Sequence, residues 1–230
     1  MVATAAPFDP ARSTRRFTIG APDAIAAVLL PPLLDALRRS APEVDVSLRQ
    51  VLPQQMDWQP ALAALEERSL DAVVIPRHDV PPRFVARRIG EEDFVIAMRA
   101  GHPFADSPTL ERYCRLQHLV TSQSSDSLAY VDRVLAARGL TRRVALTVPN
   151  FMLALALLAE TDYVAAMPRS FVAMHAARFC LTSVEAPLPF ERFRISAIVP
   201  KVALMDAGIA WLFDRLAAAW QEATAARPPS

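Results

Sequence analysis

The feature of this 230-residue sequence that most restricts its fold is a regular alternation of short strand-like runs with helix-like segments. Such alternation is typical of an α/β protein with a parallel sheet and right-handed crossovers. The pattern predicts strands at residues 16–21, 45–51, 70–75, 92–98, 118–122, 143–148, 163–167, 181–186 and 194–199. It predicts helices at residues 23–39, 60–68, 109–115, 127–138, 150–160, 170–179 and 207–222. Pro31 and Pro32 predict a kink or a break in the first of these helices.

The composition excludes several classes of ligand. The chain contains only five glycines, and no two of them have the spacing of a G-x-G-x-x-G turn or of a phosphate-binding loop. With 25 basic and 24 acidic side chains the formal net charge is +1, which argues against a strongly basic nucleic-acid surface or a polybasic membrane patch. We therefore expect neither a nucleotide in a glycine-rich loop nor DNA binding through a strongly basic surface.

The sequence indicates a cytoplasmic protein without a membrane span, metal or cofactor. The first 16 residues lack the apolar core of a secretory signal, and every apolar run is far shorter than the ~18 residues of a membrane span. Cys114 and Cys180 form either one disulfide or two reduced thiols, and the lack of an export signal favours thiols. Metal-site spacing is absent among the four histidines, which are His78, His102, His118 and His175.

Seven segments, in this order, resemble the effector-binding region of LysR-type transcriptional regulators. The first two are F-D-P-A-R-S-T-R-R-F-T-I-G-A at residues 8–21 and L-L-P-P-L-L-D-A-L-R-R-S-A-P-E-V at residues 29–44. The others are D-A-V-V-I (71–75), R-A-G-H-P (99–103), T-V-P-N-F (147–151), A-A-M-P-R (165–169) and D-A-G-I-A-W-L (206–212). Each segment alone is a weak signal, and the resemblance depends on all seven occurring in the correct order. His102, in the G-H-P turn, is expected to be structural.

The resemblance implies a type-II periplasmic-binding-protein-like α/β fold, in which two Rossmann-like subdomains are joined by two crossover strands and a small-molecule effector binds between them. It divides the chain into a flexible lead-in (1–14), a first subdomain (15–88 plus 195–222), a second subdomain (89–194) and a tail (223–230). The family's DNA-binding winged helix-turn-helix is expected to be absent, so that DNA is bound only through that missing domain. A homodimer or tetramer through the regulatory domain is also implied.

The expected ligand site consists of residues that follow strands and match the cleft of the family. The candidates are Pro22, Asp23, Gln54, Ser122, Gln123, Asn150, Phe151, Met167 and Pro168. Several have an alternative interpretation: Gln54 belongs to a solvated loop, the hydroxyls near Ser122 cap a helix, Asn150 caps its own helix, or Phe151 lies in the core. Amides, hydroxyls and a phenyl ring suit a polar small molecule that can carry an aromatic ring.

The first of these turns differs from the family pattern. Family members often have A-S-D there, and the serine and the next helix N-terminus hold an anionic effector. This chain has Ala21-Pro22-Asp23, and an Asp23 carboxylate facing the cleft would repel a simple anion. The alternative is that Asp23 is only the N-cap of the helix.

The sequence therefore predicts the effector-sensing domain of a LysR-type regulator, which binds its ligand without catalysis. Two alternatives remain. A solute-binding protein of a transporter shares the fold but needs an export signal. An enzyme on the same fold needs a cluster of titratable residues in the cleft, and the sequence positions none.

Overall fold

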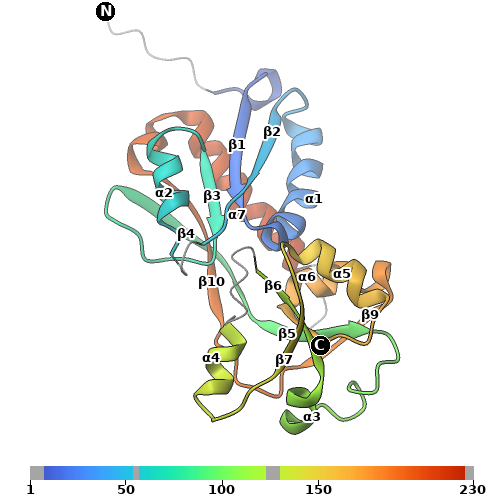
Figure 1. The fold of residues 1–230 in the computed structure, drawn as a ribbon. Helices are drawn as coiled ribbons and strands as arrows, with labels where there is room; N and C mark the ends of the chain where they lie inside the picture. The colour runs from blue at the N-terminus through green and yellow to red at the C-terminus, as the bar shows by residue number, and fades with distance from the viewer. Residues whose placement is uncertain (1–7, 54–56, 123–129, 226–230) are drawn as a thin grey trace, which may run out of the picture. The chain divides into compact units, whose positions relative to one another are not determined.

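The chain forms two compact units in a computed structural model that describes residues 8–53, 57–122 and 130–225 (Figure 1). The first unit consists of residues 1–91 and 193–230, and the second of residues 92–192. The chain therefore passes between the units twice, after Glu91 and after Arg192. The sequence placed these two passages after residues 88 and 194.

The first unit is built on a five-stranded sheet in the order β2-β1-β3-β10-β4. Its strands are β1 (Arg16–Ala21), β2 (Asp45–Gln50), β3 (Ala72–Ile75), β4 (Phe84–Glu92) and β10 (Phe193–Pro200). β1 is parallel to β2 and to β3, as the alternation predicts, whereas β10 is antiparallel to β3 and makes the sheet mixed. Most of β4 was not predicted, because exposed Arg87 and Arg88 interrupt its apolar pattern.

Helices cover both faces of this sheet. They are α1 (Asp23–Ser40), α2 (Gln59–Glu66) and α7 (Ala207–Ala225). Phe84 of β4 packs in the cluster formed with α2, whereas Arg87 of the same strand lies over the Phe213 ring of α7. Because side chains alternate between the two faces of a strand, α2 and α7 cover opposite faces. α1 packs beside α7 (Figure 1).

α1 is one continuous helix of 18 residues although Pro31 and Pro32 lie inside it. The predicted break is therefore wrong. Each proline removes a helix hydrogen bond, but Leu29, Leu33 and Leu37 on the same helix are almost fully buried. Burial of such side chains contributes roughly 1.5–3 kcal/mol each, which offsets the loss at the prolines.

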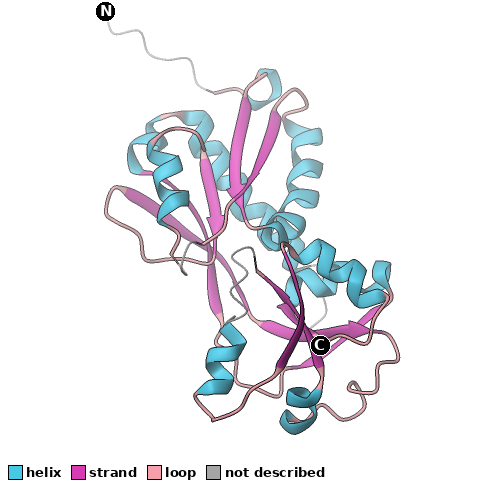
Figure 2. Ribbon diagram, viewed as in Figure 1, coloured by secondary structure: helices cyan, strands magenta, loops and turns pink. Residues whose placement is uncertain are grey.

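The second unit also has strands between helices (Figure 2). Its strands are β5 (Phe94–Arg99), β6 (Gln117–Thr121), β7 (Arg143–Val148), β8 (Ala165–Pro168) and β9 (Leu181–Glu185). β5 is antiparallel to β8 and to β9, and β6 is parallel to β7. A parallel bridge between His118 and Val164 connects β6 to the start of β8. The second unit therefore has a three-stranded sheet, β8-β5-β9, and a two-stranded sheet, β6-β7, linked by this bridge.

The helices of the second unit pack on both sides of β5. They are α3 (Leu110–Arg115), α4 (Tyr130–Ala136), α5 (Phe151–Ala159) and α6 (Arg169–His175). Ile96 and Met98 of β5 are buried in one cluster with side chains of α3 and α4. Val95 and Ala97 are also buried and point to the other face, where α5 and α6 contact β5.

Both ends of the described chain extend the first unit. Residues 8–14, expected to be part of a flexible lead-in, contain a 3-10 turn (Pro10–Arg12) capped by the Asp9 side chain. The Phe8 ring lies 5.3 Å from the ring of Trp211, centroid to centroid. α7 continues past the predicted end at residue 222 to Ala225. Within the described ranges, no helix combines the length and the apolar character needed to cross a membrane.

Candidate functional site

The carboxyl ends of the parallel strands in the first unit carry the first candidate residues. Pro22 follows β1 and is the N-cap residue of α1, and its carbonyl oxygen accepts the N–H of Ala26 at 2.9 Å. Asp23 is the first residue inside the helix, so its prediction as the N-cap is wrong. The extended backbone of Pro22 lets the helix begin there, and a carboxylate in the first turn is stabilised by the helix dipole. Gln54 lies outside the described residues.

The end of β3 adds a pair that the sequence did not indicate. Ser196 of β10 is fully buried and lies opposite Ile75, the last residue of β3. The Nδ1 atom of half-buried His78 lies 3.2 Å from the Ser196 hydroxyl oxygen. His78 was considered only as a metal ligand, and no local pattern connects two residues 118 positions apart. This pair adds a hydroxyl-bound imidazole to the same edge of the sheet.

In the second unit, two predicted residues lie at one edge of the strands. Ser122 follows β6, and its N–H donates to the carbonyl oxygen of Val148, the last residue of β7, at 2.9 Å. Asn150 follows β7, and its side-chain oxygen accepts the N–H of Leu153 at 2.8 Å. Asn150 is therefore the N-cap of α5, as one interpretation predicted. Gln123 lies outside the described residues.

The third strand reaching this edge is β8. It ends at Pro168, which is also the N-cap residue of α6. The side chain of Met167 is fully buried, and the residue pairs with Val95 of β5. Phe151 is half-buried and meets the Phe171 ring edge-on at 6.1 Å between centroids. Met167 thus belongs to the core of the unit, whereas Ser122 follows β6 and Pro168 is the last residue of β8.

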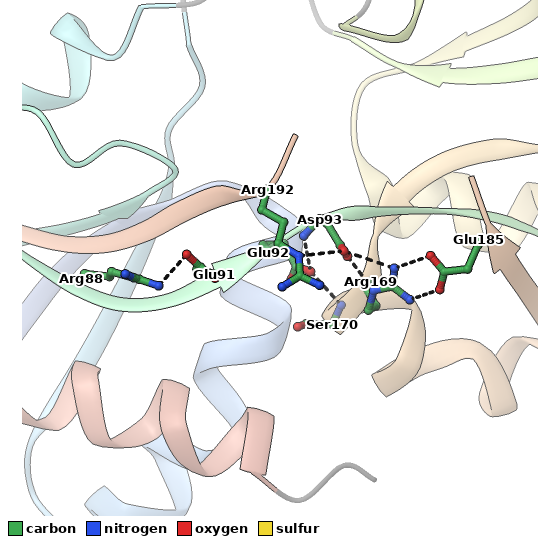
Figure 3. Close-up of polar contacts among 8 residues, drawn as sticks. All are labelled: Arg88, Glu91, Glu92, Asp93, Arg169, Ser170, Glu185 and Arg192. Atoms are coloured by element: carbon green, nitrogen blue, oxygen red, sulfur yellow. Dashed lines mark hydrogen bonds and ion pairs between the residues drawn. The ribbon is translucent and has the colours of Figure 1, made fainter. Parts of the chain in front are cut away.

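A cluster of ion pairs lies next to Pro168 (Figure 3). Arg169 donates through Nε to Asp93 at 2.6 Å and through Nη1 and Nη2 to the Glu185 carboxylate at 2.6 and 2.8 Å. Its backbone N–H donates to the carbonyl oxygen of Asp93 at 2.9 Å. Arg192 lies on the other side of Asp93, with its Nε 3.7 Å from a carboxylate oxygen. The carboxylates of Asp93 and Glu185 thus bind the Arg169 side chain at the start of α6, and Arg192 also contacts Asp93.

The carboxylates at the start of α6 have pKa values that shift in different directions. Hydrogen bonds from Arg169 lower the pKa of Glu185, and the bonds to Glu185 and Asp93 raise the pKa of Arg169. Glu92 is 6% exposed, and burial raises its pKa. One oxygen of Glu92 accepts the backbone N–H groups of Ser170 and Asp93, both at 3.2 Å, which opposes that rise. The start of α6 is therefore bound by Asp93 and by Glu92.

The sequence did not reveal this cluster. Glu92 and Asp93 were assigned to the start of a predicted strand (92–98), and Arg169 was noted only within the A-A-M-P-R segment. The pairing joins Arg169 to a residue 76 positions away. The available signal was an arginine directly after a strand end together with an acidic run at the start of another strand.

A second polar cluster lies inside the second unit, away from the strand ends. The Arg142 side chain is 1% exposed and binds both carboxylate oxygens of Asp132 at 2.8 Å. Burial lowers the pKa of Arg142, but the bonds to Asp132 outweigh it and raise the pKa overall. These residues line a hollow of about 460 Å³ between α4 and β7. Because the pair is mutually satisfied, we interpret it as part of the core.

No cluster of metal ligands accompanies either edge. Across the described ranges, there is no group of three or more His, Cys, Asp or Glu side chains placed to hold a metal ion. His102 is 4% exposed and binds the Asp162 carbonyl oxygen and the Phe104 N–H, in agreement with its expected structural role. What the strand ends offer is hydroxyl, amide, imidazole and carboxylate groups, which can bind a polar small molecule.

Comparison with known proteins identifies related chains. HTH-type transcriptional activator NagR of Ralstonia sp. is 27% identical over 206 residues, which cover 89% of this chain and 67% of NagR. HTH-type transcriptional regulator SyrM of Rhizobium meliloti (strain 1021) is 30% identical over 213 residues, which cover 91% of this chain and 63% of SyrM. This chain thus spans about two thirds of the length of these curated relatives.

Solved structures give the same result for the fold. The regulatory domain of MexT, a transcriptional activator in Pseudomonas aeruginosa, matches with a TM-score of 0.76 and 28% identity, over 90% of this chain and 98% of that domain. A probable transcriptional regulator from Pseudomonas aeruginosa matches with a TM-score of 0.77 and 29% identity, over 91% of this chain and 68% of that one. The family model described as LysR substrate binding domain matches residues 10–221. The chain has the type-II periplasmic-binding-protein-like α/β fold of these regulatory domains and belongs to the LysR substrate-binding domain family.

Proposed function

We propose that this chain is the effector-sensing domain of a LysR-type transcriptional regulator and binds a small molecule at the carboxyl ends of its parallel strands. One observation carries the proposal. In each unit, residues chosen from the sequence follow strands that end at one edge, Pro22 in the first unit and Ser122 and Asn150 in the second. Open α/β sheets bind ligands beyond the carboxyl ends of their strands.

The chemistry of these edges suggests which ligands would bind. The N-cap of α1 is a proline, which has no N–H to offer an anion, and Asp23 in the first turn adds negative charge. Ser122 and Asn150 offer a hydroxyl and an amide, while Phe151 contributes a half-buried ring. We propose a polar, neutral ligand that can carry an aromatic ring, bound by Pro22, Asp23, Gln54, Ser122, Gln123, Asn150, Phe151 and Pro168. Met167 is fully buried and supports the strand that ends at Pro168.

The proposal for the whole protein follows from the family. We propose that it regulates transcription in the cytoplasm, binds DNA through another region and assembles through this domain as a homodimer or tetramer. Exposed Leu34 of α1 and Met152 and Leu153 of α5 supply apolar surface for such contacts. Binding would proceed without catalysis, since the relatives are transcriptional regulators. The relatives also do not favour a solute-binding protein.

A thermal-shift screen over metabolites tests the proposal. A ligand present at 100 times its Kd stabilises the folded state by about 2.7 kcal/mol, which raises the Tm measurably. The expected result is a concentration-dependent rise in Tm with at least one polar small molecule that is recovered unchanged afterwards. Recovery of a chemically converted molecule would instead support an enzyme.

A further inference from the structure

Both passages of the chain between the two units lead to the same ion-pair cluster. Asp93 is the second residue after the first passage, and Arg192 is the last residue before the second passage. Arg192 reaches Asp93 at 3.7 Å, and Arg169 reaches the same carboxylate at 2.6 and 3.2 Å. A single carboxylate thus connects the two passages to the first residue of α6.

The contacts of Asp93 differ in strength. The Asp93 side chain is 17% exposed and that of Arg169 is 32% exposed, and two nitrogen atoms of Arg169 bind its two oxygens. Paired charge-assisted bonds of this kind are roughly twice as strong as neutral hydrogen bonds. The side chain of Arg192 is 73% exposed, and its longer contact resembles a surface ion pair, which contributes little to stability because solvent screens it. Arg169 therefore binds Asp93, after the first passage, more strongly than Arg192, before the second passage, does.

The backbone of α6 strengthens the first connection. The N–H of Arg169 donates to the Asp93 carbonyl oxygen at 2.9 Å, and the N–H of Ser170 donates to the Glu92 carboxylate at 3.2 Å. Two successive N–H groups at the start of α6 are therefore bound to the two residues that follow the first passage. These residues lie directly after Pro168, at the edge of the second unit that carries Ser122.

We propose that Arg169 is a positioning residue that sets the direction in which the chain leaves the second unit, so that movement at the Pro168 turn is transmitted to both passages. The link to ligand occupancy rests on the proposed function. The mechanical part does not, because it depends only on contacts that form within the second unit. Loss of the Arg169 side chain leaves the Asp93 carboxylate with the weaker contact to Arg192 and widens the range of directions in which the chain leaves the second unit.

Double electron–electron resonance on the ligand-free chain tests this proposal. Spin labels are attached at Arg39→Cys in the first unit and Glu111→Cys in the second, both exposed, in a background carrying Cys114→Ser and Cys180→Ser. We expect Arg169→Gln and Asp93→Asn to broaden the distance distribution and Arg169→Lys to broaden it less. The control is Arg88→Gln, which removes an arginine that pairs with Glu91 just before the first passage. It is expected to leave the width unchanged.

Hydrogen exchange gives an independent readout. In Arg169→Gln we expect the Ser170 amide to exchange about tenfold faster, because the start of α6 opens more often, while amides in β6 keep their protection. Unchanged distance distributions in both Arg169→Gln and Asp93→Asn would overturn the proposal. Equal broadening in Arg88→Gln would also overturn it. The distance distributions are measured without a ligand, so they do not depend on whether the thermal-shift screen finds one. Failure of this proposal can therefore be told apart from failure of the proposed function.

Discussion

At Gly90, the absence of a side chain allows β4 and α7 to pack closely. Gly90 lies on β4, and a Cβ added there would overlap the indole ring of Trp220 on α7. Trp220 is 1% exposed and among the largest buried side chains of the described chain. The glycine is therefore needed for close approach of the helix, and not for a special backbone conformation.

The first prediction concerns this contact. Gly90→Ala should lower the free energy of unfolding by about 1–3 kcal/mol, because the core around Trp220 is overpacked. Urea denaturation measures the change. Trp220→Phe removes part of the ring, so the double variant should lose less stability than the sum of the two single variants. Additive losses would show that the predicted clash with the ring does not occur.

His118 gives a prediction about pH. It is fully buried; its Nε2 lies 2.8 Å from the Tyr113 carbonyl oxygen, and its Nδ1 faces Arg142 at 3.4 Å. Burial, together with the Arg142 charge, lowers the pKa of His118 from 6.5 to about 4. Between these two pH values His118 is therefore protonated in the unfolded chain and neutral in the folded chain. Stability should fall by about 3 kcal/mol as the pH drops from about 6.5 through about 4.

Urea midpoints at several pH values across this window measure that dependence. His118→Asn removes the titrating group and should make the loss of stability on acidification shallower. An equally steep loss in His118→Asn would assign the pH dependence to other groups.

At the scale of elements, α5 depends on its first residue. Asn150→Ala removes the acceptor for the Leu153 N–H and should lower the free energy of unfolding by about 1 kcal/mol. Asn150→Asp keeps a side-chain acceptor at the N-cap and should retain the stability of the parent in chemical denaturation. A loss of the same size in Asn150→Asp would show that the amide, and not the cap, stabilises the unit.

Helices and strands with a clear local sequence pattern could be predicted. Residues 16–21 and 143–148 were predicted as strands with the bounds that the structure has, because each is short and rich in β-branched and apolar residues. A break in α1 was expected at Pro31 and Pro32, but the helix is continuous because burial of its leucines outweighs the local signal. Most of β4 was not predicted. It is an edge strand of the sheet, and its exposed charged residues interrupt the apolar pattern by which a strand is recognised.

In the candidate site, too, features with a local sequence pattern could be predicted and long-range contacts could not. The positions of Ser122 and Asn150 after strands, and the role of Asn150 as an N-cap, could be predicted because strand ends and capping residues have a local pattern. The ion pairs of Arg169 and the contact between His78 and Ser196 join distant positions, and no spacing in one sequence connects them. Long-range polar contacts of this kind depend on the completed fold.

At the scale of the whole molecule, the exposed apolar residues predict association. Leu34 on α1 is 51% exposed and Leu153 on α5 is 42% exposed. We expect the chain to sediment as a dimer at high micromolar concentration, and Leu34→Arg to shift it toward the monomer. Val202→Arg, at an exposed apolar residue outside α1 and α5, is the matched control and should leave the dimer intact. Sedimentation of the parent as a monomer alone would contradict this expectation.

The central claim is that a small molecule binds at the strand ends of both units. Calorimetric titration of a molecule found by the thermal-shift screen tests it most directly, with the parent chain, Ser122→Ala, Asn150→Asp and the exposed control Ser40→Ala. Loss of one hydrogen bond to a ligand costs roughly 1.4 kcal/mol, so Kd should rise about tenfold in Ser122→Ala and in Asn150→Asp and stay unchanged in Ser40→Ala. Parental affinity in both site variants would contradict the claim.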